Sequence, residues 1–208
     1  MTRASPIFFL RSHHRRLNAG VERRDAAGLA LFFRVLSTNG IPLPVLNVFR
    51  MFGMMGGQRL AVESSHEVGL EGIRKEGVRG KPDISALASL RNGKLCVLVW
   101  HYHNADVAGP AAAVELSVSK VPDSDRPVLL QHFRIDQYHS NAFEEWKRMG
   151  APPQPTPEQY AGLERSSHLS LLTSLEWVRP ESGKLTLRFA LPRQAVSLLV
   201  FEGVGGST

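Results

Sequence analysis

A short run near the middle of the chain holds side chains that could bind a metal ion. His101 and His103 are separated by one residue, and Asp106 follows three positions later. Alternate residues of a strand share a face, so two imidazoles and a carboxylate in this pattern could hold zinc. No further ligand from a different strand can be identified, and histidines at the end of a strand are commonly hydrogen-bonded surface groups. We therefore expect surface histidines, with a zinc site as the alternative.

Two aromatic residues, Trp100 and Tyr102, alternate with these histidines. They share the opposite face of the same strand, where their rings could stack on a sugar ring as in a carbohydrate-binding module. Packing of both rings beneath a helix is the interpretation that we favour. No glycine-rich phosphate loop, Ser/His/Asp arrangement or paired-cysteine motif is recognisable in the sequence, so we expect no cofactor.

The positive charge of the chain is concentrated near its N-terminus. The net charge is +6, and residues 1–34 account for +5 of it through seven arginines opposed by two acidic residues. The remainder is nearly neutral and has no basic stripe that could follow a phosphate backbone, so we expect no nucleic-acid partner. Residues 1–31 show little periodic apolar pattern and are expected to form a poorly ordered arm.

No stretch of the sequence is typical of export or of a membrane span. The first apolar run, residues 6–10, is shorter than the roughly 7–15 residues of a signal-peptide core. No apolar stretch approaches the roughly 18 residues of a spanning helix, so we expect no membrane partner and, by default, a cytoplasmic protein. The single cysteine, Cys96, excludes an intrachain disulfide, and its place in an apolar run indicates a buried, inert thiol.

An amphipathic helix is predicted after Pro42 and Pro44. It should end near Met55, because Gly56 and Gly57 can supply a left-handed C-cap. Its apolar residues form a stripe that a partner could cover, and they recur at helical spacing as Val45, Val48, Phe49 and Phe52.

From Gln58 onward the hydrophobic period changes from 3.6 to 2, which indicates a sheet domain. Residues 95–102 are apolar on both faces and are predicted to form a central strand, covered by the sandwich core on one side and by a helix on the other. The preceding residues 91–93, Arg-Asn-Gly, are typical of a hairpin turn. Residues 64–82, rich in glycine and charge, are predicted to form a loop.

Further strands complete the predicted sheets. Two segments alternate apolar and polar residues, at 114–119 and 185–189, and Val196, Leu198 and Val200 close the series; each of the three should have one buried face. Less regular segments predict additional strands at 60–63, 84–90 and 128–135. The set is typical of a mainly-β fold, an antiparallel two-sheet β-sandwich.

Two short capped helices are predicted in the stretch that follows residue 134. Asn141 is a typical N-cap with Glu144 three residues later. Thr156 opens the second helix, with proline at the first helical position and Gln159 at the reciprocal position of a capping box. We interpret the pair as architecture that braces a sheet edge, and a sugar-contacting role for His139 or Asn141 is the alternative.

A motif of polar and aromatic residues runs through the same stretch: Asp136, His139, Ser140, Asn141, Ala142, Phe143, Trp146, Met149, Gly150, Pro155 and Thr156. It resembles the C-terminal region of glycoside hydrolase family 39, the family of β-xylosidases and α-L-iduronidase. The resemblance extends to residues 39–50, 99–110 and 191–200, and so covers roughly residues 32–204. It implies the last helix of a (β/α)8 barrel followed by an accessory β-sandwich.

The length of the chain limits what this resemblance can imply. A (β/α)8 barrel alone takes about 250 residues, more than the 208 present here. We therefore expect the last barrel helix at residues 32–57 and the accessory sandwich at residues 58–204. The arm at residues 1–31 does not resemble the eighth barrel strand, and we interpret it either as a truncation or reading-frame scar or as a flexible arm.

The family's catalytic groups are not expected in this chain. The resemblance implies a retaining glycosidase, which needs two carboxyl groups about 5–5.5 Å apart, and in the family they lie at the ends of barrel strands. Glu176 precedes a tryptophan, as the family nucleophile does, but Val178 replaces the serine that should follow. Glu144 and Glu145 are adjacent on a helix and point in different directions, so they are predicted to be capping and surface charges.

The sequence thus predicts part of a family 39 glycosidase that is inactive alone. A carbohydrate-binding module and a non-catalytic subunit are the alternatives. The partner would be a separate glycosidase barrel, a second copy of the chain, or a carbohydrate.

Overall fold

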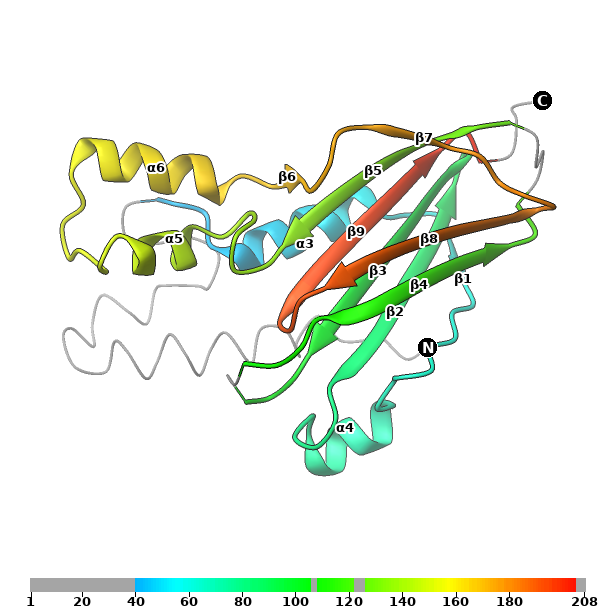
Figure 1. Ribbon diagram of the computed structural model, residues 1–208, viewed down its shortest axis with the longest axis horizontal. Helices are drawn as coiled ribbons and strands as arrows, with labels where there is room; N and C mark the ends of the chain where they lie inside the picture. The colour runs from blue at the N-terminus through cyan, green and yellow to red at the C-terminus, as the bar shows by residue number, and fades with distance from the viewer. Residues whose placement is uncertain (1–39, 106–107, 122–125, 205–208) are drawn as a thin grey trace. The chain divides into compact units, whose positions relative to one another are not determined.

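The computed structural model describes residues 40–105, 108–121 and 126–204 (Figure 1). The predicted arm at residues 1–31 and the candidate ligand Asp106 lie outside these residues. In chain order the elements are α3 (Pro44–Met54), β1 (Gln58–Leu60), α4 (Leu70–Glu76), β2 (Asp83–Arg91), β3 (Lys94–Tyr102), β4 (Ala112–Ser119), β5 (Val128–Ile135), α5 (Ala142–Arg148), α6 (Pro157–Ser167), β6 (Ser170–Leu171), β7 (Glu176–Val178), β8 (Lys184–Leu191) and β9 (Ala195–Glu202).

The chain divides into two compact units. Among the described residues, one comprises residues 40–50 together with Ser140–His168, and it contains the first part of α3 with α5 and α6. The other comprises Met51–His139 and Leu169–Thr208, and it contains all the strands listed above. The predicted boundary between residues 57 and 58 follows the family resemblance and stays a prediction.

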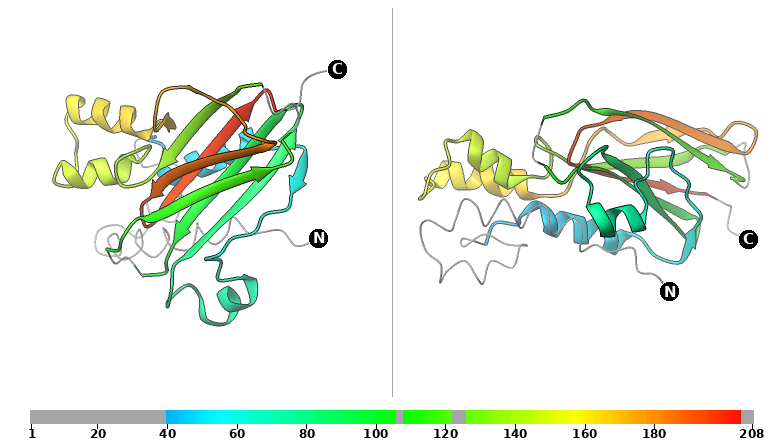
Figure 2. Two further views of the ribbon diagram at one scale, coloured as in Figure 1. Left: turned by 45° about the vertical axis from the view of Figure 1, so that its right-hand side comes forward. Right: turned by 90° about the horizontal axis from the view of Figure 1, so that it is seen from below.

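The strands form two antiparallel sheets, which confirms the predicted mainly-β sandwich. The larger sheet has the order β1-β2-β3-β9-β5-β6, with β7 also paired to β5, and the smaller sheet is the pair β4-β8. Figures 1 and 2 show β4 and β8 lying across one face of the larger sheet. Side chains from both sheets pack in one core, among them Leu130, Leu199 and Phe201 from the larger sheet and Leu116 and Phe189 from the smaller.

The hairpin between β2 and β3 is confirmed at the predicted position. Arg91 pairs with Lys94, so that the turn consists of Asn92 and Gly93 alone. Both turn residues have positive φ, 49° and 70°, as a type I′ turn requires. Asparagine and glycine adopt this conformation at little cost, and this turn fixes the register of the two strands.

The central position of β3, between β2 and β9, is confirmed, but the prediction of one buried face for residues 196–200 was wrong. β9 lies between β3 and β5 and is buried at every residue from Ala195 to Phe201. One face belongs to the sandwich core. On the other face, the Cys96 thiol of β3 donates to the carbonyl of Met54 at 3.6 Å, so the end of α3 covers this part of the sheet. Cys96 is buried as expected.

Other boundaries differ from the predictions in ways that have local causes. The strand predicted at 60–63 is β1, which ends at Leu60. The predicted loop at 64–82 contains the short helix α4, which starts at Gly69 without a side-chain cap and has no buried residue. Only the C-terminal Gly77, whose amide donates to the Ile73 carbonyl, marks this helix in the sequence, because it has neither a side-chain N-cap nor a buried apolar stripe.

Helix α3 confirms the predicted amphipathic helix. Its apolar stripe was expected to need a partner to cover it, but most of the stripe is already covered. The helix ends at Met54, and Gly57 has φ 79°. A Cβ on Gly57 would lie 2.3 Å from the Leu90 carbonyl oxygen, so close approach also favours glycine there. Val45 and Val48 are buried, Phe52 is half-buried, and Phe49 is 43% exposed.

The unit of α5 and α6 is fastened by a buried amide. Asn47 of α3 is fully buried, and its Nδ2 donates to the carbonyls of Ser140, at 3.0 Å, and of Ser167, at 2.9 Å. A small apolar cluster around Ile41, Ala142 and Leu163 completes this unit.

Both helix starts in this unit are confirmed. The Asn141 side chain accepts from the Glu144 amide, and the capping box joins Thr156 and Gln159 in both directions. No helix in the described part of the chain is long and apolar enough to cross a bilayer.

Candidate functional site

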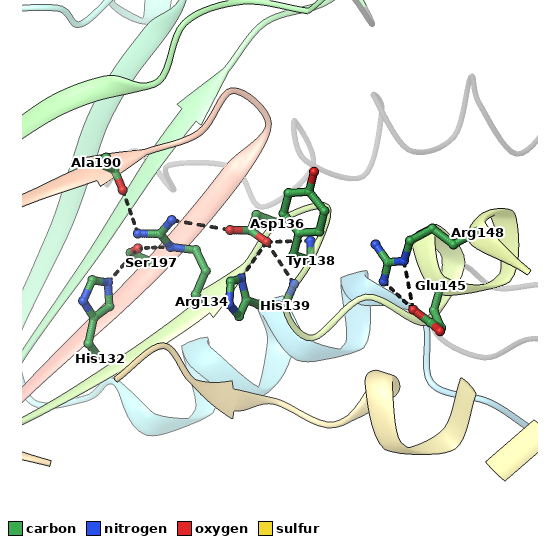
Figure 3. A network of polar contacts seen from close by, with 9 residues as sticks. All are labelled: His132, Arg134, Asp136, Tyr138, His139, Glu145, Arg148, Ala190 and Ser197. Carbon is green, nitrogen blue, oxygen red and sulfur yellow. Dashed lines mark hydrogen bonds and ion pairs between the residues drawn. The ribbon is translucent and has the colours of Figure 1, made fainter. Parts of the chain in front are cut away.

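A tight turn after β5 holds a buried carboxylate beside a partly exposed imidazole (Figure 3). Asp136 is 4% exposed, and its Oδ1 accepts from the amide of Tyr138 at 2.8 Å and from the amide of His139 at 2.9 Å. The same oxygen lies 2.9 Å from Nδ1 of His139, whose side chain is 37% exposed. The carboxylate thus assigns the proton to Nδ1 and fixes the orientation of the ring.

A buried arginine faces the other oxygen of Asp136. Arg134 is 3% exposed, and its Nη1 lies 3.5 Å from Oδ2 of Asp136. Its Nε donates to Oγ of Ser197 at 2.8 Å, and its Nη2 donates to the carbonyl of Ala190 at 3.0 Å. Burial lowers the pKa of Arg134, and Asp136 opposes this shift by its charge and its hydrogen bond. Because each nitrogen has an acceptor, the guanidinium is accommodated inside the sandwich.

His132 belongs to the same network. It lies two positions before Arg134, on the same face of β5. Its Nε2 lies 2.9 Å from Oγ of Ser197, and its ring meets Phe189 edge to face at 5.0 Å. Burial, with a smaller contribution from the charge of Arg134, lowers the pKa of His132 to about 4. The imidazole is therefore neutral at neutral pH.

Sequence reasoning missed His132, Arg134 and Ser197. A signal exists in part: His132 and Arg134 continue the series of alternate positions of Val128 and Leu130, and so lie on the face of β5 that points into the core. Their partner Ser197 cannot be identified from the sequence, because it depends on the register between β5 and β9, which pairs Arg134 with Ser197.

The network around Asp136 can orient a hydrogen-bonding group. Only the imidazole of His139 reaches solvent to a considerable extent, while Asp136 and Arg134 are saturated by one another and by neighbouring groups. Chemically, His139 is a fixed donor or acceptor for a polar ligand. A sugar contact by His139 stays a prediction.

The second candidate in the motif, Asn141, has a structural role. Its Oδ1 accepts from the Glu144 amide at 3.2 Å and caps α5. The neighbouring acidic residues pair with basic residues one turn later, Glu144 with Lys147 and Glu145 with Arg148, as Figure 3 shows for the second pair. These ion pairs agree with the predicted role of Glu144 and Glu145 as surface charges, and a capping role for their side chains stays a prediction.

The candidate metal ligands are buried, contrary to the expectation of surface histidines. His101 is 2% exposed, with Nδ1 2.9 Å from the Leu191 carbonyl. His103 is 6% exposed, accepts from the Ala105 amide at Nδ1, and has Nε2 3.0 Å from the Arg79 carbonyl. Within residues 40–105, 108–121 and 126–204, no group of three or more His, Cys, Asp or Glu side chains could hold a metal ion.

The candidate sugar-stacking residues lie in contacts typical of structural aromatics. Tyr102 is 5% exposed. Trp100 is half-buried, and its Nε1 donates to Oδ2 of the buried Asp83 at 2.7 Å. A role in sugar binding for either ring stays a prediction. The exposed tryptophan is instead Trp177 of β7, at 69%, beside Glu176.

The fold and this site define an antiparallel β-sandwich with appended capped helices. The model of the family "Glycosyl hydrolases family 39" matches residues 12–177. The chain belongs to glycosyl hydrolase family 39, as the motif around Asp136 indicated.

Solved structures with the same fold come from enzymes of this family. The GH39 enzyme from Xanthomonas axonopodis pv. citri is 17% identical with a TM-score of 0.63, over 82% of this chain and 32% of that one. A monomeric β-xylosidase from Caulobacter crescentus CB15 is 15% identical with a TM-score of 0.63, over 83% and 33%. A bacterial orthologue of human α-L-iduronidase is 23% identical with a TM-score of 0.51, over 60% and 22%. The matched part of this chain spans about a third of the first two enzymes.

Proposed function

We propose that this chain is the accessory sandwich portion of a β-xylosidase-like family 39 glycosidase and does not hydrolyse glycosidic bonds by itself. Hydrolysis with retention needs one carboxylate as nucleophile and a second carboxyl group as acid and base, both open to the substrate. The family assignment supports the glycosidase class, and the state of the buried carboxylates supports the absence of turnover.

The observation that carries this proposal concerns Asp83 and Asp136, the buried carboxylates in the described part of the chain. Oδ1 of Asp83 accepts from the Val68 amide at 2.8 Å, and its Oδ2 accepts from the Trp100 indole. Asp136 is held by Arg134 and by the turn that it organises. Both carboxylates are therefore engaged as acceptors inside the fold.

Glu176 is the remaining candidate from the sequence. It lies on the three-residue strand β7 at the rim of the sheet, where it is exposed and pairs in register with Leu130. Among the described residues, this setting provides neither the burial nor the hydrogen-bond donors that adjust a catalytic carboxyl group. We therefore assign it no catalytic role.

An assay of the 208-residue chain with an aryl β-xyloside tests the proposal. We expect turnover equal to the buffer blank for the chain and for the variants Glu176→Gln and Glu67→Gln, of which the second replaces an exposed glutamate in the segment before α4. Turnover that Glu176→Gln abolishes and Glu67→Gln preserves would overturn both the proposal and our assignment of Glu176.

The second candidate function is carbohydrate binding by the sandwich itself. The observation that favours it is the exposed indole of Trp177 on β7. An accessory module of this kind would hold substrate while a barrel, in the same or another chain, performs hydrolysis.

A protein partner at α3 is a further part of the proposal. Because Val45 and Val48 are buried, the surface that a barrel or a second copy could cover reduces to Phe49 and the exposed part of Phe52.

A further inference from the structure

The larger sheet aligns one aromatic and three charged side chains in a single row. Trp177 of β7 pairs with Leu129 of β5, which pairs on its other side with Glu202 of β9. Glu202 pairs in turn with Lys94 of β3, and Lys94 with Arg91 of β2. Directly paired residues of an antiparallel sheet share a face, so the row is continuous across five strands. At about 4.8 Å per strand, it extends over roughly 19 Å.

This row lies on the face opposite the sandwich core. Leu130, Phe201 and Leu95, the neighbours of Leu129, Glu202 and Lys94 along their strands, are core residues. The electrostatics of Cys96, two residues beyond Lys94, agree with this placement. Burial raises the pKa of the Cys96 thiol, the charge of Lys94 opposes the rise and that of Glu202 adds to it, so both charges act on this thiol from nearby.

The side chains of the row have unused binding capacity. Trp177 is 69% exposed, while Leu129 beside it is half-buried. Glu202 and Lys94 are directly opposite in register, yet within the described part of the chain their charged groups form no ion pair. The row therefore presents an exposed indole, then the half-buried Leu129, and then a carboxylate and an ammonium group that form no ion pair among the described residues.

We propose that this row is a binding site for a short oligosaccharide, with one pyranose ring stacked on the indole of Trp177, the second over Leu129, and the third and fourth hydrogen-bonded to Glu202 and Lys94. The apolar C–H face of a pyranose suits the face of an aromatic ring, and its hydroxyl groups suit paired charged acceptors and donors. One pyranose residue is about as long as the spacing between strands, so successive rings meet successive side chains of the row.

The charges favour a saccharide over a protein as the occupant. The centre of a protein interface is depleted in lysine and glutamate, and its aromatic anchors lie in desolvated pockets. Here the indole is open, and its row continues with Glu202 and Lys94. Arg91 at the far end adds a second cation, so an acidic sugar would be held there more strongly than a neutral one.

Calorimetric titration of the 208-residue chain with xylotetraose and with tetragalacturonic acid tests the site. We expect one-to-one binding, weakened about tenfold by Trp177→Ala and also weakened by Glu202→Gln. Leu70→Ala is the matched control, because Leu70 is also a large, exposed apolar side chain, 52% exposed, and lies on α4 outside the row and outside the turn around Asp136. This control should bind within about twofold of the parent chain. Stronger binding of the acidic sugar would assign Lys94 and Arg91 to its carboxylates.

Two results would overturn the inference. One is that neither sugar binds at millimolar concentration. If Trp177→Ala then removes self-association of the chain, the exposed indole serves a protein contact and the inference is equally overturned. The other is binding that Trp177→Ala leaves unchanged. The inference rests on the second candidate function, carbohydrate binding by the sandwich, and is independent of the proposed lack of hydrolysis. Because the titration measures equilibrium binding, turnover of an aryl xyloside would refute the proposed lack of activity without affecting this result.

Discussion

Asn47 and Ser167 are 120 positions apart in the sequence and are joined by a hydrogen bond of 2.9 Å from the Asn47 Nδ2 to the Ser167 carbonyl. The same amide donates to Ser140, and its oxygen accepts from Arg50. The buried Asn47 side chain therefore joins three segments by hydrogen bonds: α3 itself, the turn before α5 and the end of α6.

Replacement of Asn47 should destabilise the chain strongly. Asn47→Leu leaves two carbonyls without their donor, and each buried unsatisfied group costs about 1–3 kcal/mol, so we expect a loss of roughly 2–6 kcal/mol in the free energy of unfolding. Urea denaturation followed by circular dichroism measures it. Gln58→Ala, which removes an exposed amide on β1, should change stability by less than about 0.5 kcal/mol. Equal effects of the two variants would contradict the role of Asn47.

The stability of the sandwich should fall as the pH is lowered, in part through His132. Its pKa is about 4 in the folded chain and 6.5 as the ordinary value, so the unfolded chain binds the proton first. The resulting loss begins as the pH falls through 6.5 and is complete below about 4, where it amounts to roughly 3 kcal/mol.

The variant His132→Gln keeps a polar partner for Ser197 and removes this titration. We expect the difference in unfolding free energy between pH 7.5 and pH 4.5 to be smaller in this variant than in the parent chain. His66→Gln, at an exposed position, should retain the full difference. A pH dependence that is the same in all three proteins would exclude His132 as its source.

The buried pair of Arg134 and Asp136 should be far more sensitive than an exposed pair. Asp136→Asn leaves the guanidinium without its counter-charge, and breaking a buried pair in this way costs about 3–5 kcal/mol. Arg188 and Glu115 form a comparable pair across β4 and β8, but their side chains are 77% and 52% exposed. Glu115→Gln should therefore change the melting temperature only slightly, because surface ion pairs contribute little. Similar melting temperatures for both variants would contradict this assignment.

Self-association through α3 is expected to depend on Phe49. At 43% exposure it is the least covered residue of the predicted stripe, and burial of one such side chain is favourable by roughly 1.5–3 kcal/mol. Phe49→Asp should reduce concentration-dependent oligomerisation in sedimentation velocity, whereas Leu70→Asp on α4, at 52% exposure, should not. A monomeric parent chain at high concentration would show that this surface drives no association.

The features that the sequence predicts well are those set by nearby residues. The hairpin needs only Asn92 and Gly93, and the start of α6 needs only Thr156 and Gln159, which satisfy one another within one turn. Turns and helix caps of this kind can be predicted from the sequence because the interacting residues lie within about four positions of one another.

The features that escaped prediction depend on distant pairing. Ser197 lies in an apolar strand, and its contact with Arg134 exists only because β9 inserts beside β5. The exposure of Trp177 could not be predicted from the sequence, because it depends on the position of β7 at the edge of the sheet. The short helix α4 escaped prediction for another reason: it has no side-chain N-cap and no buried residue, and only Gly77 marks its end.

The place of β9 in the sheet has a consequence for synthesis on the ribosome. β9 is the last strand in the described part of the chain, yet it pairs with both β3 and β5. Until residues 195–202 emerge, β3 and β5 each expose an unpaired hydrogen-bonding edge, and the apolar segment Leu95–Val99 lacks half of its cover. Such edges favour pairing with other chains. The nascent polypeptide should therefore need a chaperone until its final strand is translated, and expression at low temperature should raise the soluble yield.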